Sequence, residues 1–316
     1  MSSRKPSDIN LLLAVDKPVG ITSHDVVARV RRALDERRVG HAGTLDPLAS
    51  GVMVVGVGQA TRLLGRITLD RKGYLTRIAF GTETSTDDAE GEVTRAVVPS
   101  RELEDPAFAK EALKHFLGPQ MQVPPAYSAV SVDGVRSYKR ARAGQDVELP
   151  ARPIEVYAAD LVAIEPSGEG DGPVWTVSFD VSKGTYIRSL ARDIGRAVGG
   201  AAHVADLRRV FSGSVTQRSC LSIERLDREL ARARCLDPVA VLGIPSLELA
   251  PDSLADVSNG RMLPLSSVTP RSGSPAPAEG CSVALVHAGE LCAIAVPDGG
   301  RLRMQDVFPQ AIGGVS

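Results

Sequence analysis

The chain has 316 residues, with 37 Lys and Arg against 38 Asp and Glu, so its net charge is −1. Its content of 43% hydrophobic and 24% charged residues is ordinary for a globular protein and excludes disorder over most of the length. The longest early apolar run, Leu11 to Val15, is too short for a membrane span or a signal-peptide core, and the balanced charge with only 12 aromatic residues argues mildly against a nucleic-acid partner.

The N-terminal region predicts a strand, a turn and a helix in succession. Leu11–Asp16 has the length and apolar character of a strand, and residues 17–20 form a Lys-Pro-Val-Gly turn. Thr22 and Asp25 resemble the two ends of a helix capping box, with Asp in place of the usual Glu, and apolar residues follow them at helical spacing.

Residues 40–51 form the loop with the greatest chemical interest. It holds three glycines and one proline, and it places Asp46 among small residues, where another backbone or a ligand can approach closely. The pair Asp46-Pro47 also starts ordinary turns, and this bland role is the commoner one. The loop alone leaves both interpretations open. Strands are predicted after it at Val52–Val57 and Tyr74–Phe80, with a short helix between them at Gln59–Ile67.

Two polar segments lie in the middle of the chain. Residues 83–92 hold five carboxylates with a spacing unlike that of a calcium loop, so we expect a solvated acidic loop. A helix is predicted at Pro106–Leu117. Residues 124–153 are rich in turn-forming residues and carry Arg136, Lys139, Arg140 and Arg142, and we interpret them as an insertion that protrudes from the core.

The clearest strand is Trp175–Ser182, where apolar and polar residues alternate without a break. The period then becomes helical, and Arg188, Arg192 and Arg196 follow one another at intervals of four. Residues 183–218 contain seven Lys and Arg against two Asp, which would suit RNA phosphates. A solvated basic helix face explains the same pattern equally well.

The last 71 residues differ from the rest. Short candidate strands at 281–287 and 291–296, with a Ser- and Pro-rich loop at 266–280, predict a small all-β domain over residues 246–316, separate from a larger domain over residues 1–245. This domain has four Arg against seven Asp and Glu, which argues against strong RNA binding by the domain alone. The scattered cysteines and histidines have no metal-ligand spacing, so we expect no structural metal and four reduced, mostly buried thiols.

A glycine pattern at Gly56 to Thr61 suggests a dinucleotide-binding loop only superficially. Its third glycine is missing and the surrounding chain is not a series of strand-helix-strand units, which disfavours a metabolic enzyme with a nucleotide cofactor.

Six motifs, in the right order, resemble those of the TruB-type tRNA pseudouridine synthases. They occupy residues 16–20, 40–51, 72–74, 124–129, 183–188 and 202–209. The similarity covers nearly all of residues 9–220. One departure is Ser131, where the family carries a Lys after the Tyr-Ser-Ala run, and it concerns a peripheral contact of the insertion.

The resemblance implies an α+β fold, with a catalytic domain on a mixed, largely antiparallel sheet and a C-terminal PUA-like domain. The implied activity is the isomerisation of uridine 55 in the T-loop of tRNA to pseudouridine, without a cofactor or a metal. The target base lies inside a folded loop, so it must be flipped out of its stack. We expect a cytoplasmic protein that binds tRNA, no membrane association, and a monomer.

The resemblance also assigns roles to single residues. Asp46 matches the catalytic aspartate, Arg188 the arginine that pairs with it, and Tyr74 the tyrosine that stacks on the target base and is placed to help remove its C5 proton. Expected at the substrate are Lys17, which supports the active-site loop, His41, which fills the space left by the flipped base, His203, and the pocket-lining Tyr186 and Leu207. Expected at the RNA backbone are Arg140, Lys183, Arg192 and Arg208.

Two further functions share this scaffold. A non-catalytic RNA-binding or tRNA-folding protein would be expected to lack Asp46, Tyr74 or Arg188, and all three are present. A related synthase that acts on ribosomal RNA or under a guide RNA is the other alternative. The insertion at 124–153 and the short C-terminal domain favour stand-alone action on tRNA.

Overall fold

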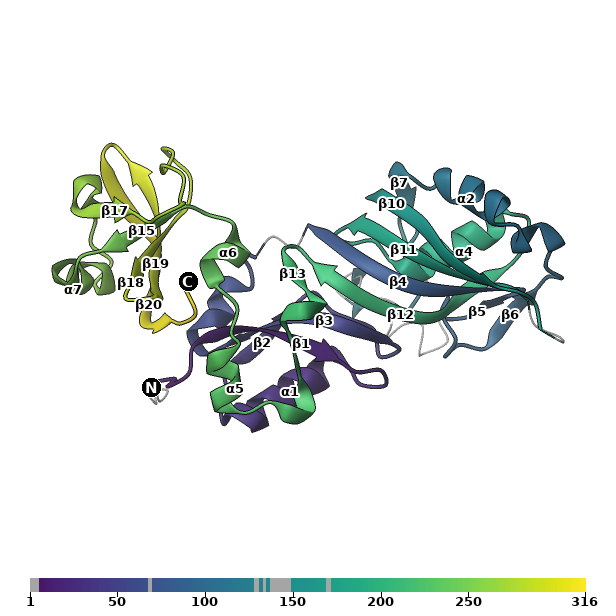
Figure 1. Cartoon of the computed structure of the whole chain (residues 1–316), viewed down its shortest axis with the longest axis horizontal. Helices are drawn as coiled ribbons and strands as arrows, with labels where there is room; N and C mark the ends of the chain where they lie inside the picture. Colours follow the sequence, from purple (N-terminus) through teal and green to yellow (C-terminus); the bar gives the residue numbers. More distant parts are fainter. Residues whose placement is uncertain (1–5, 68–69, 128–130, 133–134, 137–148, 169–171) are drawn as a thin grey trace. The chain divides into compact units, whose positions relative to one another are not determined.

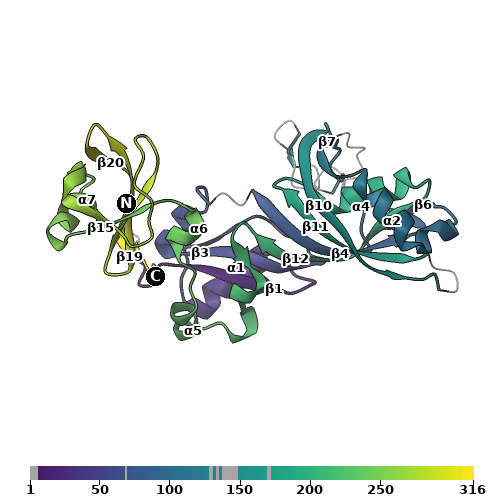
Figure 2. The same ribbon diagram turned by 45° about the horizontal axis from the view of Figure 1, so that its top comes forward.

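A computed structural model describes residues 6–67, 70–127, 131–132, 135–136, 149–168 and 172–316 (Figures 1 and 2). The chain divides into two compact units. The first contains residues 1–47, 51–69 and 213–316, and the second contains residues 48–50 and 70–212. The boundary predicted at residue 245 therefore lies inside the first unit, between two of its sheets. The division into a catalytic domain and a PUA-like domain stays a prediction.

The first unit begins with four strands of a larger sheet, and these place the loop containing Asp46. Strand β1 (Leu11–Lys17) pairs antiparallel with β3 (Ala49–Val57) and parallel with β14 (Cys220–Ser222), and β2 (Val39–Ala42) pairs with β3. Helix α1 (Ser23–Leu34) follows β1 and buries its apolar stripe. The predicted capping box is confirmed: Thr22 accepts the Asp25 N–H, and Asp25 accepts the Thr22 N–H.

The C-terminal part of this unit is an all-β sheet of its own, drawn in yellow and light green in Figure 1. Its strand order is β16-β20-β19-β18-β15-β17. The strands are β15 (Ser246–Leu249), β16 (Leu263–Pro264), β17 (Val268–Pro270), β18 (Val283–His287), β19 (Glu290–Asp298) and β20 (Arg301–Ile312). One apolar cluster joins Leu12 of β1 and Val54 of β3 to Ile294 of β19 and Phe308 of β20. The two sheets of the unit therefore share a core.

The second unit is built on an antiparallel sheet in the order β12-β4-β11-β10-β7. Its strands are β4 (Arg71–Phe80), β7 (Gly118–Gln122), β10 (Arg152–Glu165), β11 (Val174–Ser182) and β12 (Ala202–Ser212). Helices α2 (Pro106–Lys114) and α4 (Ile187–Ala197) lie next to each other against one face, as Figures 1 and 2 both show.

The remaining elements are short. A hairpin joins β5 (Thr82–Thr84) to β6 (Val93–Ala96), and another joins β8 (Ser131–Val132) to β9 (Val135–Arg136). Three more helices are α5 (Arg228–Ala233), α6 (Pro238–Leu242) and α7 (Leu254–Ser258). The 3-10 helices are Gly58–Leu63, Arg101–Glu104, Gln217–Ser219, Ile223–Arg225, Pro251–Ser253 and Leu265–Ser267.

Most sequence predictions agree with this structure. The α+β class, the largely antiparallel mixed sheet and the C-terminal all-β region are confirmed. The helix predicted at 59–67 is a 3-10 helix that ends at Leu63. The four cysteines are free thiols, but three are half-buried and Cys281 is exposed, so the prediction of mostly buried thiols is wrong. Within the described ranges, no helix combines the length and the apolar character needed to cross a membrane.

Candidate active site

The loop that carries Asp46 is held through the main chain of the residue before it. Ser23, the first residue of α1, accepts a hydrogen bond from the Leu45 N–H at 2.9 Å and donates one to the Leu45 carbonyl at 3.0 Å. Its hydroxyl is buried, with Ser23 only 2% exposed. A buried hydroxyl that both donates and accepts fixes the loop to the helix start, because breaking either bond would leave a buried polar group unsatisfied.

The residue after Asp46 is held in the same manner. The Lys17 ammonium, at the end of β1, donates to the Pro47 carbonyl at 3.2 Å and to the Pro18 carbonyl at 3.0 Å. The Gly20 N–H donates to the same Pro47 oxygen at 2.9 Å. Gly20 adopts a φ of +83°, a conformation that favours glycine. Contacts to the main chain thus fix both neighbours of Asp46. The hydrogen bond from Lys17 to Pro47 is consistent with the expected role of Lys17 in supporting the loop.

His41 lies on β2, in the same unit as Asp46 and Lys17. It is half-buried, and its ring meets the ring of His24 edge-on, with centroids 6.0 Å apart. His24 is the second residue of α1, so this contact ties the start of the helix to β2.

In the second unit, Tyr74 and Leu207 share one face of the sheet. Tyr74 on β4 is opposite Arg209 on β12, and Thr76, two residues further along β4, is opposite Leu207. Residues opposite each other and two positions apart point to the same side, so Leu207 is a diagonal neighbour of Tyr74. Both are largely buried, at 7% and 5% exposure. The structure therefore brings together two of the residues predicted to contact the base.

Helix α4 starts at a position fixed by one glutamine. The Tyr186 N–H donates to the Gln122 Oε1 at 2.9 Å, and the Gln122 Nε2 donates to the Tyr186 carbonyl at 3.0 Å. Tyr186 is the extended N-cap residue of α4, and its half-buried ring projects from this point. Arg188 follows as the second residue of the helix.

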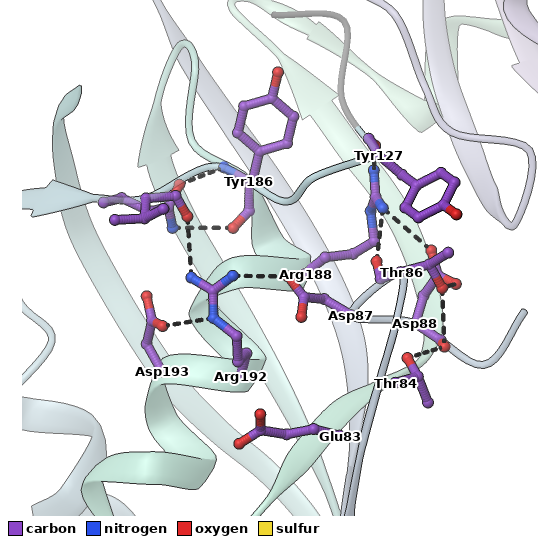
Figure 3. A network of polar contacts seen from close by, with 12 residues as sticks. Glu83, Thr84, Thr86, Asp87, Asp88, Tyr127, Tyr186, Arg188, Arg192 and Asp193 are labelled. Atoms are coloured by element: carbon purple, nitrogen blue, oxygen red, sulfur yellow. Dashed lines mark hydrogen bonds and ion pairs between the residues drawn. The ribbon is translucent and has the colours of Figure 1, made fainter. Parts of the chain in front are cut away.

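Arg188 is almost fully buried, at 4% exposure. Its guanidinium donates to the Thr86 carbonyl at 2.8 Å and to the Tyr127 carbonyl at 3.0 Å, and its Nη1 lies 3.4 Å from Asp88 Oδ2 (Figure 3). A buried charge of this kind requires acceptors and a counter-charge on several sides. The arginine is therefore held in one orientation by the segment 86–88 and by Tyr127.

Two more arginines of α4 meet the same acidic stretch. Arg192 forms ion pairs at 2.9 Å with Asp87 and with Asp193, and it donates to the Val123 carbonyl at 3.0 Å. Arg196 pairs with Glu83 at 2.6 Å. The hydrogen bond from Arg196, followed by one from Arg95, lowers the pKa of Glu83 despite its burial.

Three carboxylates of the acidic stretch are therefore not solvated as we expected, whereas Glu90 and Glu92 near its end are exposed. Glu83, Asp87 and Asp88 are only 5%, 8% and 3% exposed, because the three helix arginines neutralise them. Burial raises the pKa of Asp87, with Arg192 acting against this effect. The alternative of a solvated basic helix face does not hold for Arg188 and Arg192, whose side chains are 4% and 12% exposed, whereas the side chain of Arg196 is 55% exposed.

This pairing disfavours Arg192 as an RNA-backbone contact. Its side chain is 12% exposed, and its guanidinium already bonds two carboxylates and a carbonyl. Lys183 is better suited, since its side chain is 70% exposed, although it also pairs with Asp70 at 2.7 Å. Arg208 is half-buried, with Nη1 3.3 Å from Ser50 Oγ. Arg140 and most of the insertion at 124–153 lie outside the described residues.

His203 has a structural partner. It is half-buried on β12, with Nδ1 3.0 Å from the Thr82 carbonyl and 3.2 Å from the Thr82 hydroxyl. These contacts join β12 to β5. They give His203 a structural role that needs no bound substrate.

Sequence reasoning missed several residues that position this site. Ser23 holds the Asp46 loop and Gln122 holds the start of α4. Ser23 shows no signal beyond its place at a helix start, and Gln122 shows none at the end of β7, 64 residues before Tyr186. The pairing of the acidic stretch with α4 could have been anticipated from the sequence. Asp88, Asp87 and Glu83 lie in an acidic segment, and three arginines spaced by four offer the opposite charges. Within the described ranges, no group of three or more His, Cys, Asp or Glu is arranged to hold a metal ion.

Two family models match the chain. Residues 31–187 match the TruB family pseudouridylate synthase N-terminal domain, and residues 188–240 match the tRNA pseudouridylate synthase B C-terminal domain. The border between them falls at Ile187 and Arg188, the first two residues of α4.

Similar proteins include several named tRNA pseudouridine synthase B. The one from Mycobacteroides abscessus is 45% identical over 80% of this chain and 84% of its own. That from Arthrobacter sp. is 40% identical over 94% of this chain and 96% of its own, and that from Streptomyces avermitilis is 48% identical over 69% and 73%.

Two solved structures share the fold. One is an H/ACA RNP bound to a substrate RNA containing 2′-deoxyuridine, with a TM-score of 0.65 and 23% identity. The other is a Cbf5-Nop10-Gar1 complex, with a TM-score of 0.64 and 25% identity. Each match covers 94% of this chain and 84% of the other.

Proposed function

The chain belongs to the TruB family of pseudouridylate synthases, and from this membership we propose that it isomerises uridine 55 in the T-loop of tRNA to pseudouridine. The enzyme class follows from the family, and tRNA is the substrate that the names of its relatives give. The single position, the T-loop and the roles of individual residues are the proposal.

The observation that best supports Asp46 as the reacting carboxylate is the way its loop is held. Ser23 fixes Leu45 and Lys17 fixes Pro47, so the main chain on both sides of Asp46 is anchored to buried groups. A carboxylate on an anchored loop is preorganised, and preorganisation lowers the barrier because no reorientation is needed during the reaction.

The reaction breaks the C1′–N1 bond of the uridine, turns the uracil and forms a C1′–C5 bond. N1 gains a proton and C5 loses one, so no other reactant is consumed. We propose that Asp46 either attacks carbon or removes a ribose proton in the first stage. Arg188 holds the negative charge in place, and Tyr74 stacks on the base with its hydroxyl available for the C5 proton.

The remaining residues serve RNA binding in this proposal. His41 fills the space that the flipped base leaves, and Tyr186 and Leu207 line the base pocket, where Leu207 is a neighbour of Tyr74 on the sheet. Lys183, Arg208 and Arg140 contact the backbone of the stem-loop. Recognition depends on the shape of the T-loop more than on a linear sequence, and the protein acts as a monomer in the cytoplasm.

Tritium release tests this function directly. Wild-type protein should release tritium from tRNA that contains uridine tritiated at C5, and Asp46→Asn should release none while it binds the same tRNA with nearly unchanged affinity. Tritium release by the variant at the wild-type rate would contradict the role of Asp46. Tight binding without release by the wild type would instead support the non-catalytic alternative.

A further inference from the structure

Lys72 is a basic residue next to the proposed base pocket that the function has not yet used. It lies on β4, opposite Val181 of β11 and Ser212 of β12, and it is half-buried. Among the described residues, its ammonium has no ion pair or side-chain hydrogen bond. The charged groups that act on it are Arg209 of β12, Lys183 after β11 and Asp70 before β4. The one acid of these, Asp70, pairs with Lys183 at 2.7 Å.

Two cations and one acid thus act on the Lys72 ammonium. Burial, followed by the repulsion from Arg209 and Lys183, lowers the pKa of Lys72 from its ordinary value to about 8. Asp70 acts in the opposite direction and does not compensate. A partly buried ammonium that forms no ion pair among the described residues would be stabilised by a bound anion.

The register of the sheet relates this ammonium to Tyr74. The two residues lie two positions apart on β4, so both point to the same face and their Cα atoms are about 7 Å apart. Arg209 lies directly opposite Tyr74 and is fully buried. On the other face, a side chain at Gly73 would collide with the ring of Phe211, which keeps the strand closely packed there.

We propose that Lys72, with Lys183 beside it, binds a phosphate of the RNA next to the target nucleotide. The inference rests on the proposed function, because it is the base placed against Tyr74 that brings a phosphate to Lys72. RNA carries one such charge per nucleotide, so a base at Tyr74 necessarily places phosphates close by. The side chain of Lys183 is 70% exposed, so it can exchange Asp70 for a phosphate oxygen.

Salt dependence tests the phosphate contact. The affinity for a T-arm stem-loop RNA should be measured between about 50 and 300 mM salt for wild type, Lys72→Met, Lys72→Arg and the control Lys110→Met. Lys110 is an exposed lysine of α2. Losing one phosphate contact should reduce the slope of log affinity against log salt by about 0.7 to 0.9. We expect this for Lys72→Met alone, whereas equal slopes for Lys72→Met and Lys110→Met would overturn the proposal.

The pH dependence separates the contact from a packing effect. Phosphate binds the protonated lysine, so the wild-type affinity should fall as the pH rises from 7 to 10, through the range in which Lys72 loses its proton. Lys72→Arg stays charged over this range and should keep its affinity, because the guanidinium does not titrate there. If wild type and Lys72→Arg lose affinity in parallel, the pH effect comes from another group and the proposal fails.

Replacing single RNA phosphates with uncharged methylphosphonates identifies the phosphate that Lys72 contacts. Stem-loops with a single methylphosphonate 5′ or 3′ of the target uridine should bind the wild type about tenfold more weakly at one of the two positions, and Lys72→Met should be insensitive at that position. If inorganic phosphate competes with RNA equally well for wild type and Lys72→Met, the site is not at Lys72. These readouts measure binding only, so they can fail while tritium release succeeds, or succeed while Asp46→Asn stays active.

Discussion

The structure shows different kinds of contact in the Asp46 loop and in the acidic stretch at 83–88. In the stretch, Glu83, Asp87 and Asp88 are each neutralised by an arginine of α4 and buried. In the loop, the anchoring contacts act on main-chain atoms of the residues before and after Asp46. The difference teaches that the number of acidic residues in a segment says little about reactivity.

The largest expected effect on stability comes from removing an arginine that pairs with the acidic stretch at 83–88. Arg188→Met leaves Asp88 buried without its main counter-charge, so the free energy of unfolding should fall by about 3–5 kcal/mol. The matched control is Arg77→Met, which breaks an exposed pair with Glu165 and should cost less than about 1 kcal/mol. Urea unfolding measures both. Equal losses in the two variants would show that the buried pair has no special role.

The loop should respond differently. Ser23→Ala removes both hydrogen bonds to Leu45, so we expect kcat to fall about ten- to a hundredfold with little change in KM, and the free energy of unfolding to fall by about 1–3 kcal/mol. Thr22→Ala is the control, since it removes the N-cap of the same helix and should cost about 1 kcal/mol without lowering kcat. A kcat loss of equal size in both variants would show that Ser23 acts only by stabilising the helix and does not position the Asp46 loop.

Arg192 tests whether the helix arginines are structural. Because its guanidinium bonds Asp87, Asp193 and Val123, Arg192→Met should destabilise the protein by about 2 kcal/mol and leave the salt dependence of tRNA binding unchanged. Lys183→Met, in contrast, should reduce the salt slope by about one. A reduced salt slope for Arg192→Met would instead show that Arg192 contacts an RNA phosphate.

The smallest effects concern pH. The lowered pKa of Glu83 contributes stability that is present above its unfolded value near 4.5 and lost as the pH falls through its folded value. The raised pKa of Asp87 works in the other direction, with its contribution greatest at low pH and lost as the pH rises through its folded value. Stability curves of Glu83→Gln and Asp87→Asn from pH 3 to 7 should therefore deviate from wild type with opposite slopes. Parallel deviations would contradict the assignment.

The elements with a clean period were predictable from the sequence. The alternation before Ser182 predicted β11, and the helical period after it predicted α4. Strands β10 and β12 were not recognised, because bulges interrupt their alternation and β12 places Arg208 and Arg209 in mid-strand. Local periodicity cannot show a strand whose pairing shifts register.

The site was predictable only in part. Motif resemblance singled out Asp46, Tyr74 and Arg188 as candidates, and their roles stay predictions. The acidic stretch was interpreted as solvated, because the sequence alone does not reveal that β5 and α4 are neighbours. Ser23 escaped notice for a related reason, since its partner Leu45 is 22 residues away. Contacts between distant segments, not the residue types, carry this information.

Mapping pseudouridine in a tRNA transcript is the most direct test of the account. Wild-type protein should convert one uridine, at position 55 in the T-loop, and Asp46→Asn should convert none under conditions in which it still binds the transcript. Conversion at another position would contradict the proposed target. Conversion of uridine 55 by Asp46→Asn would contradict the claim that the anchored loop presents the reacting carboxylate.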